Sequence, residues 1–211
     1  MWEARNKMMR TIWIVFEGID GSGKTTQAKM LNEYLSGKGI KCIYKHIFDS
    51  KAGSILREVF INNEFSNTVD ILLLCAARQA FLDEIEREKG TFDIIILDRF
   101  FLSILAMQGK SKEDIELINY IKNFIFNKKD IFYTFYLDTN PHECKRRLIK
   151  KSYCDRIERK NVEFHSIVYD RYLDLLENES NVYVFNGDID IMSLHKKIVD
   201  KASELVGLIM E

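Results

Sequence analysis

Residues 16–27 form a glycine-rich segment that leaves this chain few choices of fold. The segment reads Phe-Glu-Gly-Ile-Asp-Gly-Ser-Gly-Lys-Thr-Thr-Gln, which has the phosphate-loop spacing of one glycine, four residues and then Gly-Lys-Thr. An apolar run at 12–16 precedes it and an amphipathic stretch at 27–35 follows it, so the expected order is strand, loop, helix. In that order, backbone N–H groups surround a phosphate at a helix N-terminus. The segment therefore predicts a site for a nucleoside triphosphate.

The loop assigns expected roles to individual residues. Lys24 is expected to reach the terminal phosphates of ATP, and Thr25 to hold Mg²⁺ through its hydroxyl. The other ATP-binding positions predicted from this segment are Gly18, Asp20, Gly21, Ser22, Gly23 and Thr26. The predicted cofactors are ATP and Mg²⁺.

The rest of the chain alternates apolar runs with helical patterns. Strands are expected at 11–17, 40–47, 92–97, 131–138 and 182–186. Helices are expected at 24–36, 52–60, 67–88, 99–107, 111–127, 140–150, 158–178 and 190–210. Continuous apolar runs such as 94–97 indicate strands that are covered on both faces. This order predicts a doubly wound α/β fold with a five-stranded parallel sheet, whose ligands bind at the carboxyl ends of the strands.

Asp98 and Arg99 directly follow the third expected strand, so both side chains should emerge at the carboxyl edge of the sheet. An acid at this edge can hold Mg²⁺ or a water bound to it, and an arginine can clamp a phosphoryl oxygen. The alternative is a simple salt bridge at the end of a strand. The phosphate loop in the same chain favours the functional interpretation.

A basic cluster follows the fourth expected strand, and its members are Lys145, Arg146, Arg147, Lys150, Lys151, Arg156, Arg159 and Lys160. Arg147 and Lys151 share one helix face, where like charges repel unless an anion lies between them. A solvated basic face is the ordinary explanation for such a run. Because the run sits just before Asp155-Arg156-Ile157-Glu158 in a chain with a phosphate loop, we expect a lid over the triphosphate at about 145–160, with Arg147, Lys151 and Arg156 contacting ATP.

Composition excludes several classes of protein. The net charge of −1 gives the molecule no overall attraction to nucleic acid. No apolar run is long enough to span a membrane, and residues 1–10 lack the apolar stretch of a signal peptide. We therefore expect one cytoplasmic phosphate-loop domain over 1–211, with a tail at 1–10 and without a nucleic-acid or membrane partner.

Taken in order, these motifs resemble the thymidylate kinase family. The resemblance rests on Glu17, the phosphate loop, Thr26-Gln27, Ala76-Ala77-Arg78, Asp98-Arg99-Phe100, Ser103, Ala106, Gln108, Leu137-Asp138, Pro141, Arg147 and Asp155-Arg156-Ile157-Glu158. It implies transfer of a phosphoryl group from ATP to a nucleoside monophosphate, most simply dTMP. The acceptor in such a reaction is itself a phosphate, so little general-base help is needed. The resemblance also implies catalytic roles for Lys24, Arg99, Arg147 and Lys151. The loop carries no arginine between Asp20 and Gly23, which in the family goes with cations supplied by the lid, so Arg147, Lys151 and Arg156 matter more.

The same resemblance implies a homodimer and an acceptor pocket. The family's dimer would use helices equivalent to the apolar stretch at 71–81, although core packing explains that stretch equally well. The implied substrate-binding positions are Asp20, Lys45, Leu74, Arg78, Arg99, Ile104, Met107 and Gln108, with Asp20 at the sugar 3′-hydroxyl and Asp98 joining Thr25 at the metal.

The acceptor side is where the chain departs from the family pattern. Lys45-His46-Ile47-Phe48 stands where Arg-Glu-Pro-Gly is usual, and Lys45 can replace the arginine only as a point charge. Leu74, Ile104 and Met107 stand where the family has a stacking aromatic residue, a polar reader of the thymine edge and a tyrosine near the sugar. We therefore expect an apolar pocket in which dUMP or another pyrimidine monophosphate competes with dTMP within roughly 10–200-fold.

Other functions stay open at this point. A nucleoside kinase would need a carboxylate base near a sugar hydroxyl, and Glu17 is the only well-placed candidate. A GTP-dependent switch is suggested by Asn127-Lys128-Lys129-Asp130, but this motif precedes a strand where it should follow one, and Asp-x-x-Gly is missing after the third strand. A family member that has lost activity is the remaining alternative.

Overall fold

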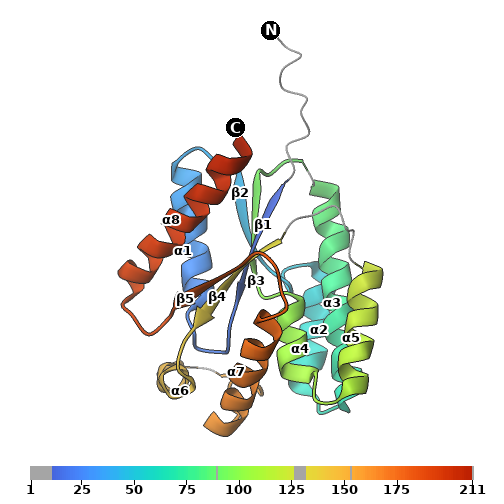
Figure 1. Ribbon diagram of the computed structural model, residues 1–211. Helices are drawn as coiled ribbons and strands as arrows, with labels where there is room; N and C mark the ends of the chain where they lie inside the picture. The colour runs from blue at the N-terminus through green and yellow to red at the C-terminus, as the bar shows by residue number, and fades with distance from the viewer. Residues whose placement is uncertain (1–10, 89, 126–131, 153, 211) are drawn as a thin grey trace.

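The computed structural model describes residues 11–88, 90–125, 132–152 and 154–210. Within them lies one five-stranded parallel sheet with the strand order β2-β3-β1-β4-β5 (Figure 1). The strands are β1 (Ile12–Glu17), β2 (Cys42–His46), β3 (Ile94–Asp98), β4 (Phe132–Asp138) and β5 (Val182–Asn186). The helices are α1 (Lys24–Gly37), α2 (Lys51–Asn62), α3 (Asn67–Glu88), α4 (Phe101–Gln108), α5 (Lys112–Ile125), α6 (Pro141–Ile149), α7 (Val162–Leu176) and α8 (Ile191–Met210). The expected doubly wound parallel α/β fold is confirmed.

Helices cover both faces of the sheet, as the continuous apolar strands require. One hydrophobic cluster contains Ile14 and Ile96 of the sheet with Leu31 of α1 and Ile198 of α8. The opposite cluster contains side chains from α2, α3, α4, α5 and α7. Figure 1 shows the same division, with α1 and α8 on one side of the sheet and α2 to α5 on the other.

The strand order places β1 and β3 side by side, and this pairing builds the centre of the site. Phe16 at the end of β1 is in register with Asp98 at the end of β3, and Asp98 is in register with His46 of β2 on the other side. The chain passes from β1 to β2 on one side of β1 and from β3 to β4 on the other side. The direction of the connections therefore reverses between the neighbouring strands β1 and β3. Ligands of open parallel sheets bind at such a switch point, outside the carboxyl ends of the strands.

Two helices begin later than the sequence pattern suggested, for local reasons. The helix expected from 99 begins at Phe101, because Arg99 has φ +71°, in the left-handed region that a right-handed helix does not use. The helix expected from 158 begins at Val162, where Asn161 caps it by accepting a hydrogen bond from the backbone N–H of Phe164.

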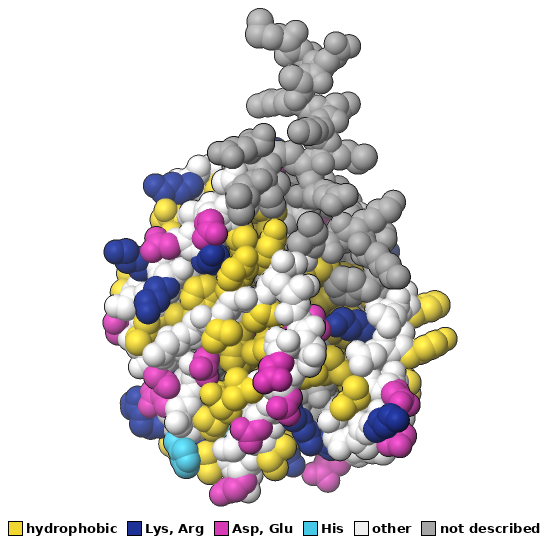
Figure 2. All heavy atoms as spheres, in the orientation of Figure 1, with side chains coloured by type: hydrophobic (Ala, Val, Ile, Leu, Met, Phe, Trp, Pro, Cys, Tyr) yellow, Lys and Arg dark blue, Asp and Glu magenta, His cyan; other side chains and the backbone are white. Residues whose placement is uncertain are grey.

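The surface of the described residues is of mixed character. Hydrophobic side chains lie among charged ones on the face seen in Figure 2, and Val184 of the edge strand β5 is 58% exposed. No helix in the described parts of the chain is long and apolar enough to cross a membrane. The expected tail at 1–10 and the Asn-Lys-x-Asp motif at 127–130 lie outside the described residues.

Candidate active site

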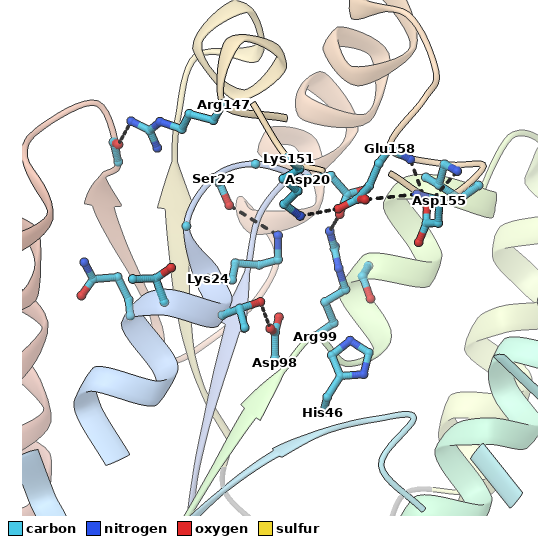
Figure 3. Close-up of a pocket in the computed structure, with 18 of the residues that line it drawn as sticks. Asp20, Ser22, Lys24, His46, Asp98, Arg99, Arg147, Lys151, Asp155 and Glu158 are labelled. Carbon is cyan, nitrogen blue, oxygen red and sulfur yellow. Dashed lines mark hydrogen bonds and ion pairs between the residues drawn. The ribbon is translucent and has the colours of Figure 1, made fainter. Parts of the chain in front are cut away.

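A cavity of about 1040 Å³ lies at the carboxyl edge of the sheet. Its walls combine the glycine loop, the ends of β2 and β3, helices α2 to α4, the segment after α6 and the loop between β5 and α8. Figure 3 shows Lys24, Asp98 and Arg99 pointing into this space from below, with Arg147, Lys151 and Glu158 above them. Residues that are far apart in the sequence therefore converge on one site.

The glycine loop is closely packed and can take only the smallest residue at its centre. A Cβ atom on Gly21 would lie 2.5 Å from the carbonyl oxygen of Cys144, and φ of Gly21 is +88°. Gly23, with φ +99°, stands at the start of α1, where the free N–H groups of the first helical turn favour an anion. The loop therefore has the backbone geometry of a phosphate cradle.

Lys24 is held inside this loop. Its ammonium group donates a hydrogen bond of 2.8 Å to the carbonyl of Ile19 and lies 3.5 Å from the hydroxyl of Ser22. Burial lowers the pKa of Lys24 to about 8, and the charge of Arg99 acts in the same direction. The negative charge of a phosphate would oppose both effects, so this lysine is poised for an anionic ligand.

Thr25 and Asp98 supply two oxygen ligands at one point. The Thr25 hydroxyl donates a hydrogen bond to the Asp98 carboxylate, and the Tyr44 hydroxyl lies 3.4 Å from the same oxygen. Asp98 is only 2% exposed. A hydroxyl and a carboxylate beside the phosphate loop match the hard oxygen donors that Mg²⁺ prefers, so these residues fit the expected metal.

Arg99 lies between the loop and the rest of the cavity. Its guanidinium pairs with the carboxylate of Asp20, and it also donates to the carbonyl of Gly18 and the hydroxyl of Tyr172. Burial by itself would raise the pKa of Asp20, but the charges of Arg99 and Lys24 outweigh it and bring the pKa to about 2. The guanidinium is thus fixed by a carboxylate that remains ionised at neutral pH.

Glu17 supports Arg99 from below. One carboxylate oxygen accepts the backbone N–H of Phe100 at 2.7 Å, and the other accepts the Tyr172 hydroxyl at 2.8 Å. Because Arg99 occupies the left-handed region without being glycine, its backbone is strained, and this bond to Phe100 holds the next residue in place. Glu17 has no exposed surface and does not line the cavity. It is therefore not placed to take a proton from a sugar hydroxyl, which argues against the nucleoside kinase alternative.

Several of the basic residues after β4 already have carboxylate partners. Glu143 pairs with Arg146 at 2.6 Å and with Arg147 at 2.8 Å, and hydrogen bonds from both arginines bring its pKa to about 2. Lys151 pairs with Glu158 at 2.6 Å. The repulsion that suggested a bound anion between Arg147 and Lys151 is thus relieved by acidic side chains of the chain itself.

The other end of the cavity combines apolar side chains with a few polar groups. Leu74, Ile104 and Met107 line it, as expected, together with Arg78 and Gln108. Arg78 is 2% exposed and donates to the carbonyls of Leu74 and Phe100, which fixes its guanidinium in the wall. The side-chain oxygen of Gln108 is buried and accepts no hydrogen bond from the described residues. Gln108 thus lines the cavity with an unpaired acceptor oxygen that is covered in this conformation.

Three expected residues do not form part of the cavity wall. Gly18 lies behind the loop and meets Leu137 and Ser22. Lys45 is in register with Leu97, so its side chain lies on the opposite face of the sheet from that of His46, which is in register with Asp98 and does line the cavity. Arg156 turns away from the cavity and pairs with Asp70.

Several wall residues had no distinct signal in the sequence. His46, Phe48, Arg57 and Phe60 line the acceptor side, and Glu143, Asp188 and Asp190 line the remainder. Apart from His46, which ends β2, they come from loops and helix faces with ordinary composition. The departure of 45–48 from the family pattern was the one hint that this region matters to the site.

The loop, the hydroxyl–carboxylate pair of Thr25 and Asp98 and the convergent cations define a phosphate-loop nucleotide-binding protein of the α/β class. Comparison with known proteins narrows the class. The family model described as thymidylate kinase matches residues 16–198. A thymidylate kinase of Thermoanaerobacter sp. (strain X514) is 33% identical over 205 residues, which cover 91% of this chain and 97% of the relative. The chain therefore belongs to the thymidylate kinase family.

Other relatives give the same result from different organisms. A thymidylate kinase of Legionella pneumophila (strain Corby) is 31% identical over 92% of this chain and 94% of its own length. One from Thermosipho melanesiensis is 33% identical over 90% of this chain and 98% of its own length. The resemblance noted in the sequence thus extends over nearly the whole chain, and the family assignment made from the motifs is confirmed.

Proposed function

We propose that this protein transfers the terminal phosphoryl group of ATP to dTMP, giving ADP and dTDP. The observation that carries the proposal is that the phosphate loop and a partly apolar acceptor pocket lined by Leu74, Ile104 and Met107 open into the same cavity of about 1040 Å³. Single small molecules occupy pockets of roughly 300–1,000 Å³, so a cavity of this size suits two nucleotides meeting at their phosphates. Family membership supports dTMP as the acceptor.

The donor side binds ATP through the loop and the first turn of α1. Residues 20–26 present backbone N–H groups to the phosphates, and Lys24 exchanges its bond to the Ile19 carbonyl for a phosphate oxygen. Thr25 and Asp98 are the residues that would hold Mg²⁺. When bound, this ion neutralises phosphate oxygens during transfer.

The transfer itself depends on position and charge. Arg99 reaches the boundary between the two ends of the cavity, where it can clamp the phosphoryl group on its way to the acceptor. Asp20, paired with Arg99, takes the sugar 3′-hydroxyl. The attacking atom is a phosphate oxygen of dTMP, already ionised at neutral pH, so the reaction needs no carboxylate base. The burial of Glu17 is consistent with that requirement.

Arg147 and Lys151 act from the lid. Their side chains are 31% and 52% exposed in their present ion pairs, so both can move to a phosphate. Arg147 would exchange Glu143, and Lys151 would exchange Glu158, for the more highly charged triphosphate. The lid in this way supplies the positive charge that the glycine loop lacks.

Gln108 bears on the expected selectivity of the acceptor pocket. Gln108 lines the pocket and has an unpaired side-chain oxygen, and a rotation of that side chain would let the oxygen accept the N3–H of thymine. Uracil carries the same N3–H, and one methyl group is worth only about 1–3 kcal/mol in an apolar pocket. We therefore keep the expectation that dUMP competes within roughly 10–200-fold, whereas cytosine and adenine lack an N–H at the corresponding ring nitrogen.

An acceptor screen tests the function. ADP formation is measured with ATP, Mg²⁺ and each ribo- and deoxynucleoside monophosphate in turn. We expect dTMP to give the highest kcat/KM, followed by dUMP. Gln108→Leu should lower kcat/KM for dTMP by about 10- to 100-fold, because it removes a buried hydrogen bond worth about 1–3 kcal/mol. Turnover with a nucleoside but with no monophosphate would refute the proposal.

We further propose a homodimer through α2 and α3. These helices carry a group of apolar side chains that are exposed in the single chain, namely Ile55, Val59, Phe65, Val69 and Leu72. The stretch at 71–81 contributes mainly to the core, since Ile71 and Phe81 are at most 2% exposed. Light scattering during gel filtration distinguishes a dimer from a monomer, and Ile55→Asp with Leu72→Asp should shift the molecule to a monomer.

A further inference from the structure

The lid segment 154–160 contacts the acceptor side of the cavity, although its basic residues were expected to serve ATP. Arg156 donates to the carboxylate of Asp70, in the first turn of α3, at a distance of 2.8 Å. The guanidinium carbon of Arg156 also lies 4.2 Å from the ring centroid of Phe60. The side chain of Asp70 is 10% exposed and that of Arg156 is 23% exposed, so water screens this pair only weakly.

Phe60 links this contact to the cavity. Its ring is 6% exposed and lines the acceptor end, and the planar guanidinium of Arg156 lies over it. A cation held over an aromatic face by a second, acidic partner restricts the orientation of that ring. Arg156 thus fixes a wall residue of the acceptor pocket without entering the pocket.

The preceding residue makes a parallel contact. Asp155 pairs with Arg57 of α2 at 3.4 Å, and the guanidinium carbon of Arg57 lies 5.9 Å from the ring centroid of Phe48. Arg57 and Phe48 both line the cavity. The side chain of Asp155 also caps its own turn by accepting the N–H groups of Ile157 and Glu158. Two successive lid residues therefore each hold an aromatic side chain of the acceptor wall, one directly and one through Arg57.

We propose that Asp155 and Arg156 are positioning residues that set the acceptor wall of α2, so that affinity for the nucleoside monophosphate depends on the lid. The inference rests on the proposed function for the identity of the acceptor. It divides the lid into two parts. Arg147 and Lys151 face the donor phosphates, whereas Asp155 and Arg156 hold the acceptor wall, Asp155 from the cavity lining and Arg156 from behind it.

The test compares Arg156→Met, Arg156→Lys, Asp70→Asn and the double variant Asp70→Asn with Arg156→Met. Lys160→Met is the matched control, because it removes one positive charge from the exposed end of the same segment. The Kd for dTMP is measured by calorimetry in the absence of ATP, and KM is measured for each substrate. Hydrogen exchange of residues 154–160 and 51–62 is followed without any nucleotide.

We expect Arg156→Met and Asp70→Asn each to raise the Kd for dTMP by about tenfold and to change KM for ATP by less than about twofold. The Kd of the double variant for dTMP should be no higher than that of the single variant that binds dTMP less tightly, because both substitutions remove the same interaction. Arg156→Lys should fall between, since lysine keeps the charge but loses the planar stacking on Phe60. Lys160→Met should behave like the unmodified protein.

Two results would overturn the inference. One is an unchanged Kd for dTMP with a raised KM for ATP, which would assign Arg156 to the donor phosphates. The other is that Asp70→Asn and Arg156→Met act independently, so that their fold-changes in the Kd for dTMP multiply in the double variant. If the unmodified protein phosphorylates no monophosphate, the proposed function fails, and hydrogen exchange then decides on the contact separately. Faster exchange in both segments with Arg156→Met, but not with Lys160→Met, would support it, and unchanged exchange would refute it.

Discussion

Replacing Glu17 tests whether its carboxylate has a structural or a catalytic role. Glu17→Leu leaves the N–H of Phe100 and the hydroxyl of Tyr172 buried without their acceptors, which now lie at 2.7 and 2.8 Å. Each such loss costs about 1–3 kcal/mol, so the free energy of unfolding should fall by about 2–6 kcal/mol. That is a large part of the roughly 5–15 kcal/mol available to a domain. Arg99 loses its support at the same time, and turnover should fall with it.

Glu17→Gln is the informative partner variant. It keeps an acceptor oxygen for Phe100 and removes the charge. Burial raises the pKa of Glu17, so the charged carboxylate carries a desolvation cost in the folded protein that the neutral amide avoids. We expect a loss of only about 1 kcal/mol and a kcat for dTMP within about tenfold of the unmodified enzyme.

Urea unfolding and steady-state kinetics on both variants measure these quantities. A cost below about 1 kcal/mol for Glu17→Leu would mean that the two hydrogen bonds contribute little to stability. A drop of about 10²- to 10⁴-fold in kcat for Glu17→Gln, with the fold intact, would identify Glu17 as a general base. That outcome would restore the nucleoside kinase alternative.

Three further predictions address the phosphates and their partners. Lys24→Ala should lower kcat by about 10²-fold or more without lowering the melting temperature, and near-normal turnover would contradict the role of the loop. Arg147→Ala and Lys151→Ala should each lower kcat more than they raise KM for dTMP, whereas a change in KM alone would place them at the acceptor. Folding lowers the pKa of Asp20 from 3.8 to about 2, because Arg99 and Lys24 outweigh its burial, so its contribution to stability is present above about pH 4 and is lost as the pH falls towards 2. In urea unfolding from pH 5 to pH 2, the free energy of unfolding should fall less for Asp20→Asn than for the unmodified protein. Parallel plots of this free energy against pH would refute the stabilising role of ionised Asp20.

The sequence was most informative where structure depends on neighbouring residues. The strand at 182–186 and the helix at 67–88 have the bounds that their apolar patterns predicted. Element ends were harder, because they depend on single interactions. Arg99 has φ +71°, and the next residue, Phe100, donates its backbone N–H to the distant Glu17. The residues around Arg99 contain no pattern that predicts this conformation.

The same distinction explains the site. Lys24 and Thr25 could be assigned from their spacing, because one loop and one helix turn place them. Lys45 was placed in the wall from its position in a motif, but the alternation of side chains along β2 turns His46 to the cavity instead. Arg156 was assigned to ATP for its charge, yet its partner Asp70 lies 86 residues away in the sequence. Such a pairing has no local signal and appears only when the chain is folded.

The balance of charge around the cavity explains how a site for two polyanions remains selective. The acidic lining residues are Asp20, Asp98, Glu143, Asp155, Glu158, Asp188 and Asp190, and the basic ones are Lys24, Arg57, Arg78, Arg99, Arg146, Arg147 and Lys151, seven of each. Arg99, Arg147 and Lys151 each pair with one of these acids. An incoming phosphate must therefore attract these cations more strongly than the carboxylates do. A lone phosphate ion offers little surplus, whereas a triphosphate seated on the loop can draw several cations at once. The carboxylates that hold the arginines in place therefore also set the threshold for the ligand that releases them.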